Sequence, residues 1–323
     1  MAEGSTFSFS DPDAYAAAFG DTRVDLTITG AGDFKAWLTR LKLKHLEVYR
    51  CCESLPRIAY ISLPPGSIFL SFPIGKGSSR FGGCALQNGD IVLHGQGERG
   101  HQQFDGACEW GLIASPPDQL ARYCKTLTER PITLPHARTI LSPSRAEGSR
   151  FRALFRRACH LAGAGKKSIE HAKMATALEQ EMLDAIVNCL SANEKKGNSK
   201  AKLHHAAVMV RLEETLIKRP DQRLNMSALC AEIGVAERTL RVCCAEFLGV
   251  SPMRYLLLRR LNEARSALRC ANPSTSTVAE VARNHQFLEL GRFAVTYRTT
   301  FGESPSVTLQ RDPRTPPSSA EFA

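Results

Sequence analysis

Two arginines three positions apart, Arg238 and Arg241, are the side chains of this sequence best suited to a defined chemistry. They belong to the stretch LCAEIGVAERTLRVCCAEFLGVSP, Leu229 to Pro252. A guanidinium group is a rigid fork of donors that can pair bidentately with a phosphate or with the edge of a guanine. On a helix, positions three apart share one face. The pair therefore predicts hydrogen-bonded recognition of a nucleic acid.

The cysteines allow a second chemistry. The chain has 11 of them, an odd number, and contains no C-x-x-C, so neither a disulfide framework nor a zinc ribbon is indicated. The adjacent Cys243 and Cys244 raise the hypothesis of a thiol switch, because oxidation there would disturb the helix. Cys244 falls on the inward face of that helix, however, and the stronger interpretation is a small buried hydrophobic residue.

The histidines give little support for a metal site or an enzyme. His94 and His101 lie seven positions apart with Glu98 between them, but no H-x-H is present. No G-x-S-x-G or P-loop motif occurs either, so we expect no catalytic residue, metal or cofactor. Five residues of this half could line an effector pocket, although ordinary barrel roles are favoured: Arg57, Arg80, His94, Arg99 and Trp110.

The elements that position the arginines form a helix-turn-helix. We predict one helix over Met226 to Ile233, ended by Gly234, and a second over Glu237 to Phe247. The second helix places Leu240, Cys244 and Phe247 inward at i, i+4 and i+7. Its outward face then consists of Glu237, Arg238, Arg241, Val242 and Ala245.

A similar unit occurs about fifty residues later. It ends with FGESP from Phe301, which is similar to the FLGVSP that ends the first unit. The capping box Thr277-x-x-Glu280 predicts a short helix to Asn284, a turn at 285–287 and a helix over Glu289 to Thr300 with Phe293 and Tyr297 inward. Between the units, Ser251-Pro252 opens a long helix that would act as a stiff rod. If both units bind, the rod fixes their second helices about one duplex turn, roughly 34 Å, apart.

The first part of the chain has a different pattern. Residues 22–115 contain short apolar runs separated by turn signals, which predicts an antiparallel barrel or sandwich. Helices are expected near 118–126, 145–162 and 168–190, and the last has an apolar stripe that must pack on the barrel or on another subunit. Residues 191–202 resemble a linker, and 311–323 a disordered Pro/Ser-rich tail.

Charge is distributed unevenly between these parts. The formal net charge is +10: residues 1–192 carry 22 Lys and Arg against 19 Asp and Glu, and residues 193–323 carry 20 against 13. Every basic residue from Asn225 to Gln310 is arginine. An excess of this kind fits a nucleic-acid partner, although a solvated basic face explains it as well. No apolar run is long enough to span a membrane, and the N-terminus lacks a signal-peptide pattern.

With these motifs described, the last hundred or so residues resemble the DNA-binding domain of the AraC/XylS family of bacterial transcription regulators. The resemblance is carried by LCAEIGVAERTL, by PMRYLLLRRLNEARSAL, and by VAEVARNHQF with GRFAVTYRTTFGESPS. It implies that Arg238, Arg241 and Val242, then Gly291, Ala294 and Val295, face bases, and Arg292 and Arg298 could contact phosphates. Gln286 departs from the family, which normally has glycine there. The family also implies activation through RNA polymerase and an N-terminal barrel for an effector and for dimerisation.

The predicted fold class is α+β and multidomain, with a cupin-like antiparallel β-barrel and helical appendage followed by an all-α domain. The expected boundaries are 1–190, 191–202, 203–310 and 311–323. We expect a cytoplasmic, homodimeric, sequence-specific activator that binds double-stranded DNA and RNA polymerase, associates with the nucleoid when bound to DNA, and has no membrane partner. A repressor or thiol-switched regulator is the alternative, and a cupin-type metalloenzyme is a remote one.

Overall fold

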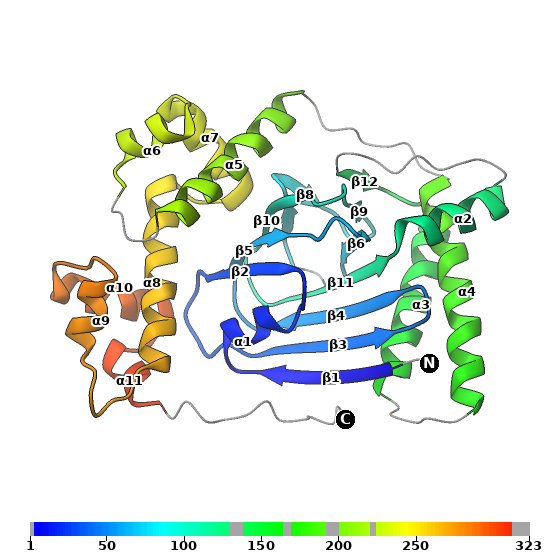
Figure 1. Ribbon diagram of the computed structural model, residues 1–323, viewed down its shortest axis with the longest axis horizontal. Coiled ribbons are helices and arrows are strands. Elements are labelled where there is room, and N and C mark those ends of the chain that lie inside the picture. The colour runs from blue at the N-terminus through cyan, green and yellow to red at the C-terminus, as the bar shows by residue number, and fades with distance from the viewer. Residues whose placement is uncertain are drawn as a thin grey trace.

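The computed structural model describes residues 3–75, 77–128, 138–163, 169–191, 200–219 and 224–311. Figure 1 shows a sheet-rich half and a helical half that lie side by side. The expected linker lies mostly outside the described residues, and so does the expected tail apart from Arg311. Within the described ranges, no helix combines the length and the apolar character needed to span a membrane.

The first half is built from two antiparallel sheets. One has seven strands in the order β1-β3-β4-β11-β6-β9-β12, and the other has five in the order β2-β5-β10-β7-β8. The strands of the first sheet are β1 Glu3–Phe9, β3 Ala36–Lys42, β4 Glu47–Glu53, β11 Cys108–Ser115, β6 Ile68–Pro73, β9 Ile91–Leu93 and β12 Thr139–Leu141. Those of the second are β2 Arg23–Ile28, β5 Arg57–Ser62, β10 Arg99–Phe104, β7 Ser79–Phe81 and β8 Cys84–Leu86.

Alternation along the strands assigns side chains to two different cores. In β11, Trp110 and Leu112 face the interior between the sheets, whereas Ile113 packs on the other side with the helices. This follows from the period of two in a strand. Because both faces of the seven-stranded sheet are covered, β6 reads as a continuous buried run and gives no alternating signal.

Three helices make the appendage: α2 Pro117–Thr128, α3 Arg145–Gly163 and α4 Ile169–Ser191. A further short helix, α1 Pro12–Ala17, lies on the opposite side. Most of the predicted apolar stripe of α4 is buried within this chain, where Leu178, Met182 and Ile186 join the core under the seven-stranded sheet. Met174 is left 61% exposed. The stripe therefore packs mainly on its own barrel.

The second half is entirely helical. Its elements are α5 Lys200–Lys218, α6 Met226–Ile233, α7 Glu237–Leu248, α8 Pro252–Cys270, α9 Val278–Asn284, α10 Leu290–Phe301 and α11 Pro305–Gln310. The predicted caps are present: Ser251 accepts from the Arg254 amide, and Thr277 and Glu280 form a reciprocal capping box. The fold class expected from the sequence, a barrel-like antiparallel domain and an all-α domain with two helix-turn-helix units, is confirmed.

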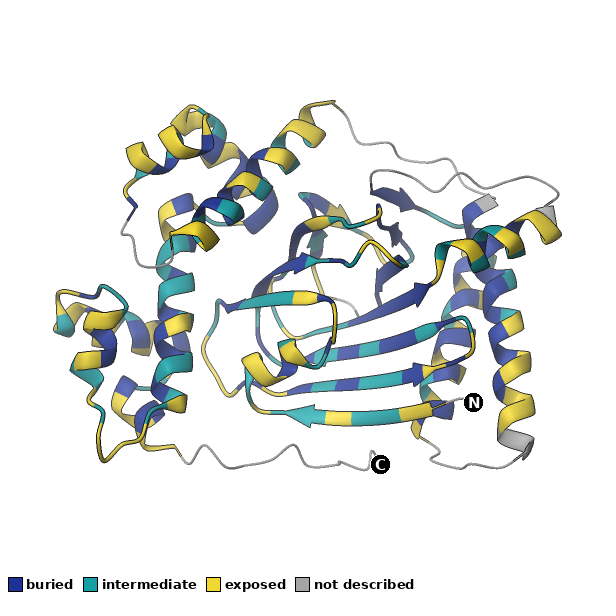
Figure 2. Ribbon diagram, in the orientation of Figure 1, coloured by how far each residue is buried: buried dark blue, intermediate teal, exposed yellow. Residues whose placement is uncertain are grey.

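Apolar contacts join the two halves. Ile58 of β5 belongs to the same buried cluster as Leu240 of the first helix-turn-helix unit and Tyr255 of α8. The interior of the sheets is likewise continuous with the cluster around Leu261 of α8 and Phe293 of the second unit. Figure 2 shows exposed residues along the outer sides of α6, α7, α9 and α10, away from the sheets. The helical half is therefore docked on the barrel with its outer helices left accessible.

Candidate nucleic-acid interface

The first unit presents α7 as predicted by the periodicity. Leu240, Cys244 and Phe247 are buried in its core, at most 2% exposed. Cys243 is buried as well, which the pattern did not indicate. The residues predicted to face a ligand are all exposed: Glu237, Arg238, Arg241, Val242 and Ala245. In the free protein the Arg241 guanidinium donates two hydrogen bonds to Glu237 Oε1, at 2.8 and 2.6 Å.

The second unit presents α10 in the same way. Phe293 and Tyr297 are buried, and Tyr297 Oη donates to Thr308 Oγ1 at 2.8 Å. The residues predicted to face a ligand are again all exposed: Gly291, Arg292, Ala294, Val295 and Arg298. The two outward faces thus agree in geometry and differ in chemistry, because the second is mostly apolar.

The continuous helix α8 separates the two units. At about 1.5 Å per residue, its 19 residues span about 28 Å. Figure 1 shows α6 and α7 near one end of it and α9 and α10 toward the other. This length is of the same order as the roughly 34 Å repeat of a duplex.

Each of the two turns contains one residue with a left-handed backbone. Gly234 ends α6 with φ 74°, a left-handed conformation natural for glycine. In the second unit Gln286 adopts φ 62°, the one positive φ among the described non-glycine residues. Gln286 therefore keeps a left-handed conformation without the freedom of glycine, which introduces backbone strain.

Several arginines of α8 have structural partners that the sequence did not reveal. Arg259 pairs with Glu213 of α5, and Arg265 with Glu303 at 3.1 Å. Arg269 lies 3.6 Å from Asp11 and donates to the Ser10 carbonyl at 2.9 Å. These three arginines of α8 therefore form ion pairs with other elements of the fold. The acidic partners lie far away in the chain, so the sequence does not show which arginine pairs with which acidic residue.

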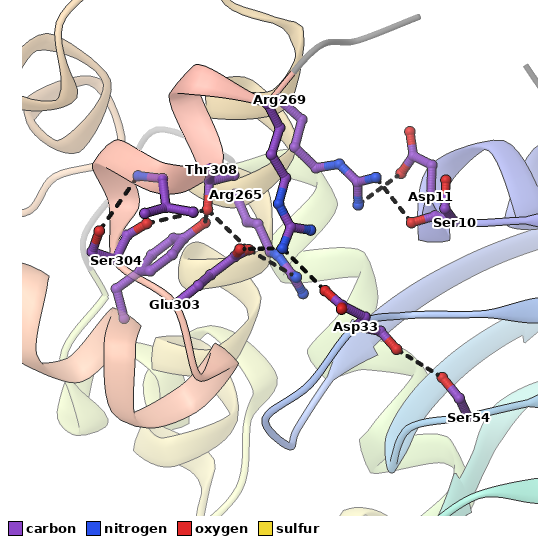
Figure 3. A network of polar contacts seen from close by, with 12 residues as sticks. Ser10, Asp11, Asp33, Ser54, Arg265, Arg269, Glu303, Ser304 and Thr308 are labelled. Atoms are coloured by element: carbon purple, nitrogen blue, oxygen red, sulfur yellow. Dashed lines mark hydrogen bonds and ion pairs between the residues drawn. The ribbon is translucent and has the colours of Figure 1, made fainter. Parts of the chain in front are cut away.

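Figure 3 shows how these contacts cross from the helical half to the barrel. Arg269 reaches Ser10 and Asp11 in the segment before α1. Arg311 bridges Asp33 and Glu303 at 3.0 and 2.8 Å. Nearby, the Asn262 side chain donates to and accepts from the backbone of Ile28, both at 3.0 Å. The second unit is thus attached to the barrel through polar contacts around α8.

The first unit is attached through a buried carboxylate. Glu213, 0% exposed, accepts from Tyr255 Oη at 2.7 Å, lies 2.8 Å from His101 Nε2 of β10, and pairs with Arg259. Burial by itself raises the pKa of Glu213, but Arg259, with His101 and Tyr255, outweighs it and lowers that pKa to about 2. An ionised carboxylate therefore joins β10, α5 and α8.

The five residues considered for an effector pocket occupy different surroundings. Arg57 and Trp110 are buried and both donate to Glu53, at 2.6 and 2.9 Å. His94 lies 2.8 Å from Ser71 Oγ. The remaining two face the helical half: Arg99 pairs with Glu214, and Arg80 is 3.5 Å from the Ala245 carbonyl. They do not form one group.

The space inside the barrel is small. A cavity of about 20 Å³ lies beside His94 and Trp110, which is room for about one water molecule. A much larger open groove, about 720 Å³, runs between α1, β2 and α8 and is lined by Thr22, Asn262 and Arg265 among others. A small organic molecule would fit the groove between the halves and not the interior in this conformation.

The thiols of α7 are poor nucleophiles. Burial raises the pKa of Cys243 to about 11 and that of Cys244 to about 12. A thiolate is the reactive form, so both are suppressed near neutral pH. Among the described residues no group of three or more His, Cys, Asp and Glu is arranged to hold a metal ion.

Comparison with known proteins bears on this helical region. A family model described as a helix-turn-helix domain matches residues 229–311. The probable thc operon regulatory protein of Rhodococcus erythropolis is 40% identical over 92 residues, 28% of this chain and 28% of that protein. XylDLEGF operon transcriptional activator 2 of Pseudomonas putida is 37% identical over 103 residues, 31% of this chain and 62% of that protein. The AraC-like transcriptional activator CuxR superposes over 80% of this chain and 95% of its own, with 17% identity and a TM-score of 0.41.

These matches define the carboxy-terminal region as a helix-turn-helix DNA-binding domain. The domain belongs to the AraC/XylS family of transcription regulators, in agreement with the motifs of its two units. The matched segments span less than two thirds of either curated relative.

Proposed function

We propose that this protein is a sequence-specific DNA-binding transcription regulator whose helices α7 and α10 enter successive major grooves on one face of a duplex. One observation carries the proposal: two outward-facing, exposed helices stand at a separation fixed by the single continuous helix α8. In such a unit the second helix inserts into the major groove. Arg238 and Arg241 supply the donors that suit guanine edges.

The regulatory sense proposed is activation of nearby promoters by contact with RNA polymerase. The Pseudomonas putida relative is named a transcriptional activator, and its likeness covers 31% of this chain. A promoter reporter in cells with and without the protein separates activation from repression. Lower transcription in the presence of the protein would assign it to the repressors.

The barrel half is proposed to regulate and to dimerise the protein, which would act in the cytoplasm and at the nucleoid. The groove of about 720 Å³ between the halves is the proposed effector site, because the barrel interior has room for about one water. Dimerisation is proposed through α3 and α4, where Met174 is exposed. Sedimentation of wild type and of Met174→Asp tests the dimer, which the charge should weaken. The proposed boundaries remain 1–190 and 203–310.

The direct test is a genome-wide map of bound DNA made with wild type, Arg238→Ala and Arg241→Ala. Each substitution should relax the preferred sequence at one position, because a bidentate contact to one base is lost. Unchanged binding sites in both variants would refute the assigned role of α7.

The alternatives have their own tests. A thiol-switched regulator would lose promoter binding under a mild oxidant. The raised pKa values of Cys243 and Cys244 argue against this alternative, because they keep both thiols protonated. A cupin-type metalloenzyme would retain stoichiometric metal through purification, which elemental analysis detects. The curated relatives are regulators, which favours the proposed function.

A further inference from the structure

The outward face of α10 is apolar where a DNA-reading helix usually carries hydrogen-bonding groups. Ala294 is exposed, and Val295 is 67% exposed, more than Val242 of α7 at 46%. None of the described residues covers most of this valine. Its accessible methyl groups are surface that a partner could remove from water.

The hydroxyl groups of the same helix are engaged by its own backbone. Thr296 Oγ1 donates to the Arg292 carbonyl at 2.8 Å, and Thr299 Oγ1 donates to the Val295 carbonyl at 2.9 Å. At the start of the helix, the Arg292 side chain pairs with Glu289 at 3.0 Å. Between Arg292 and Arg298, the outward face of α10 therefore presents methyl groups to solvent.

We propose that α10 recognises thymine, by contact of Ala294 and Val295 with the thymine C5-methyl group. The inference rests on the proposed function and names the base that this helix selects. Among the four bases, only thymine offers an apolar group on the floor of the major groove. Arg292 and Arg298 lie at the two sides of the apolar surface and suit a polyanionic partner, which favours DNA over an apolar protein surface.

Gly291 supports a close approach of DNA to the same face. It is the second residue of α10, where glycine weakens a helix relative to alanine. Its φ lies outside the left-handed region, and a Cβ built there meets no atom within 4 Å. The fold therefore does not require glycine, whereas a neighbouring sugar-phosphate backbone would. A small residue here lets the start of α10 sit deep enough for Val295 to reach a base.

The test uses the full-length protein and duplexes in which single thymines are replaced by deoxyuridine, which lacks only the methyl group. A binding site is first selected from a random duplex pool. Each thymine within it is then replaced in turn, and dissociation constants are measured. One or two replacements should each weaken binding by about four-fold, the value for one buried methyl group.

The variant Val295→Ala connects the lost methyl group to this residue. In that variant, replacing the same thymine with deoxyuridine should weaken binding by less than two-fold, because the thymine methyl group no longer contacts a valine methyl group. The matched control is Val307→Ala, since Val307 is 47% exposed on α11, outside both reading helices. It should reproduce the wild-type pattern. Gly291→Ala should weaken DNA binding while raising the melting temperature.

The outcomes separate this inference from the function on which it rests. If no sequence is selected, the proposed function fails. If a sequence is selected but no deoxyuridine weakens binding, or if the loss persists unchanged in Val295→Ala, thymine reading by α10 is wrong. If Val295→Ala leaves DNA binding intact and abolishes only promoter activation, the apolar face contacts a protein. An unchanged affinity of Gly291→Ala would overturn the close approach.

Discussion

The two helix-turn-helix units share their interior and differ in what they present. Leu240 in α7 and Phe293 in α10, 53 positions apart, are both buried at 2% or less. On the outside, each helix carries two arginines. In α7 they are three positions apart and accompanied by Glu237, whereas in α10 they are six positions apart and separated by Ala294 and Val295. The inward residues must fill a fixed space, whereas the outward ones are free to change. One scaffold can therefore hold two chemically different reading surfaces.

The units also differ in how they are attached to the barrel. The first is joined by the buried Glu213, shared among His101, Tyr255 and Arg259. The second is joined by partly exposed pairs, such as Arg311 with Asp33. A buried carboxylate with several partners is costly to disrupt, whereas an exposed ion pair contributes about 0–1 kcal/mol. We therefore expect the first unit to be the more firmly held.

Removing the buried carboxylate should have the largest effect. Glu213→Ala leaves Arg259 in the buried site without its charge partner, and we expect a loss of about 3–5 kcal/mol in the free energy of unfolding. Urea unfolding measures it. The neighbouring Glu214→Ala is the control, because Glu214 forms an exposed pair with Arg99 and should cost less than about 1 kcal/mol. Equal losses in both variants would contradict the ranking of the two attachments.

The same carboxylate should make stability depend on pH. Its pKa is lowered in the folded state to about 2, against about 4.3 for an unfolded glutamate. Its contribution is therefore complete above about pH 4.3 and is lost as pH falls toward about 2. Comparing urea midpoints of wild type and Glu213→Gln from pH 5 to pH 2.5 isolates this group. The difference between them should shrink on acidification, and a constant difference would show that Glu213 does not titrate there.

Arginine substitutions should distinguish base reading from phosphate contact. Arg238→Ala and Arg241→Ala should each reduce discrimination at one base pair by about 1–3 kcal/mol. Arg298→Ala in α10 should instead weaken all sequences alike and lower the slope of binding against salt by about one unit. Binding to selected and scrambled duplexes at several salt concentrations separates the two. A loss of sequence preference in Arg298→Ala would reverse the assignment.

The smallest effect is expected at the turns. Gln286→Gly should raise the free energy of unfolding by about 0.5–1 kcal/mol, because glycine removes the left-handed strain. The reciprocal change, Gly234→Ala in the first unit, should lower it by about 1 kcal/mol. Thermal unfolding checks both. If both changes shift the melting temperature in the same direction, backbone strain is not what distinguishes the turns.

Local features were predictable from the sequence. The bounds of α6 and α9 match the expected ranges, and α7 and α10 end one residue later than expected. The expected outward residues are exposed because helix periodicity alone assigns a face. Strands β1 and β12 were not predicted, because they lie outside residues 22–115, and both are edge strands of the seven-stranded sheet.

The candidate site was only partly predictable. Arg259, Arg265 and Arg269 counted as basic charge suited to phosphates, yet each has an acidic partner in the fold. The effector residues were grouped by type and by nearness in sequence. Arg57 turns into the interior toward Glu53, whereas Arg99 points out toward Glu214. The direction of a side chain depends on strand register, which short apolar runs do not specify.

The sequence by itself determined the helices, their caps, the repeat of the two units and the chemistry of each outward face, because these depend on residues within about four positions of each other. The tertiary structure alone decided which charges remain available. Glu213 and His101 are 112 positions apart, and Arg311 and Asp33 are 278 apart. Whether an arginine binds a ligand or its own chain depends on where the barrel docks. That docking follows from packing between distant apolar surfaces, which no local pattern encodes.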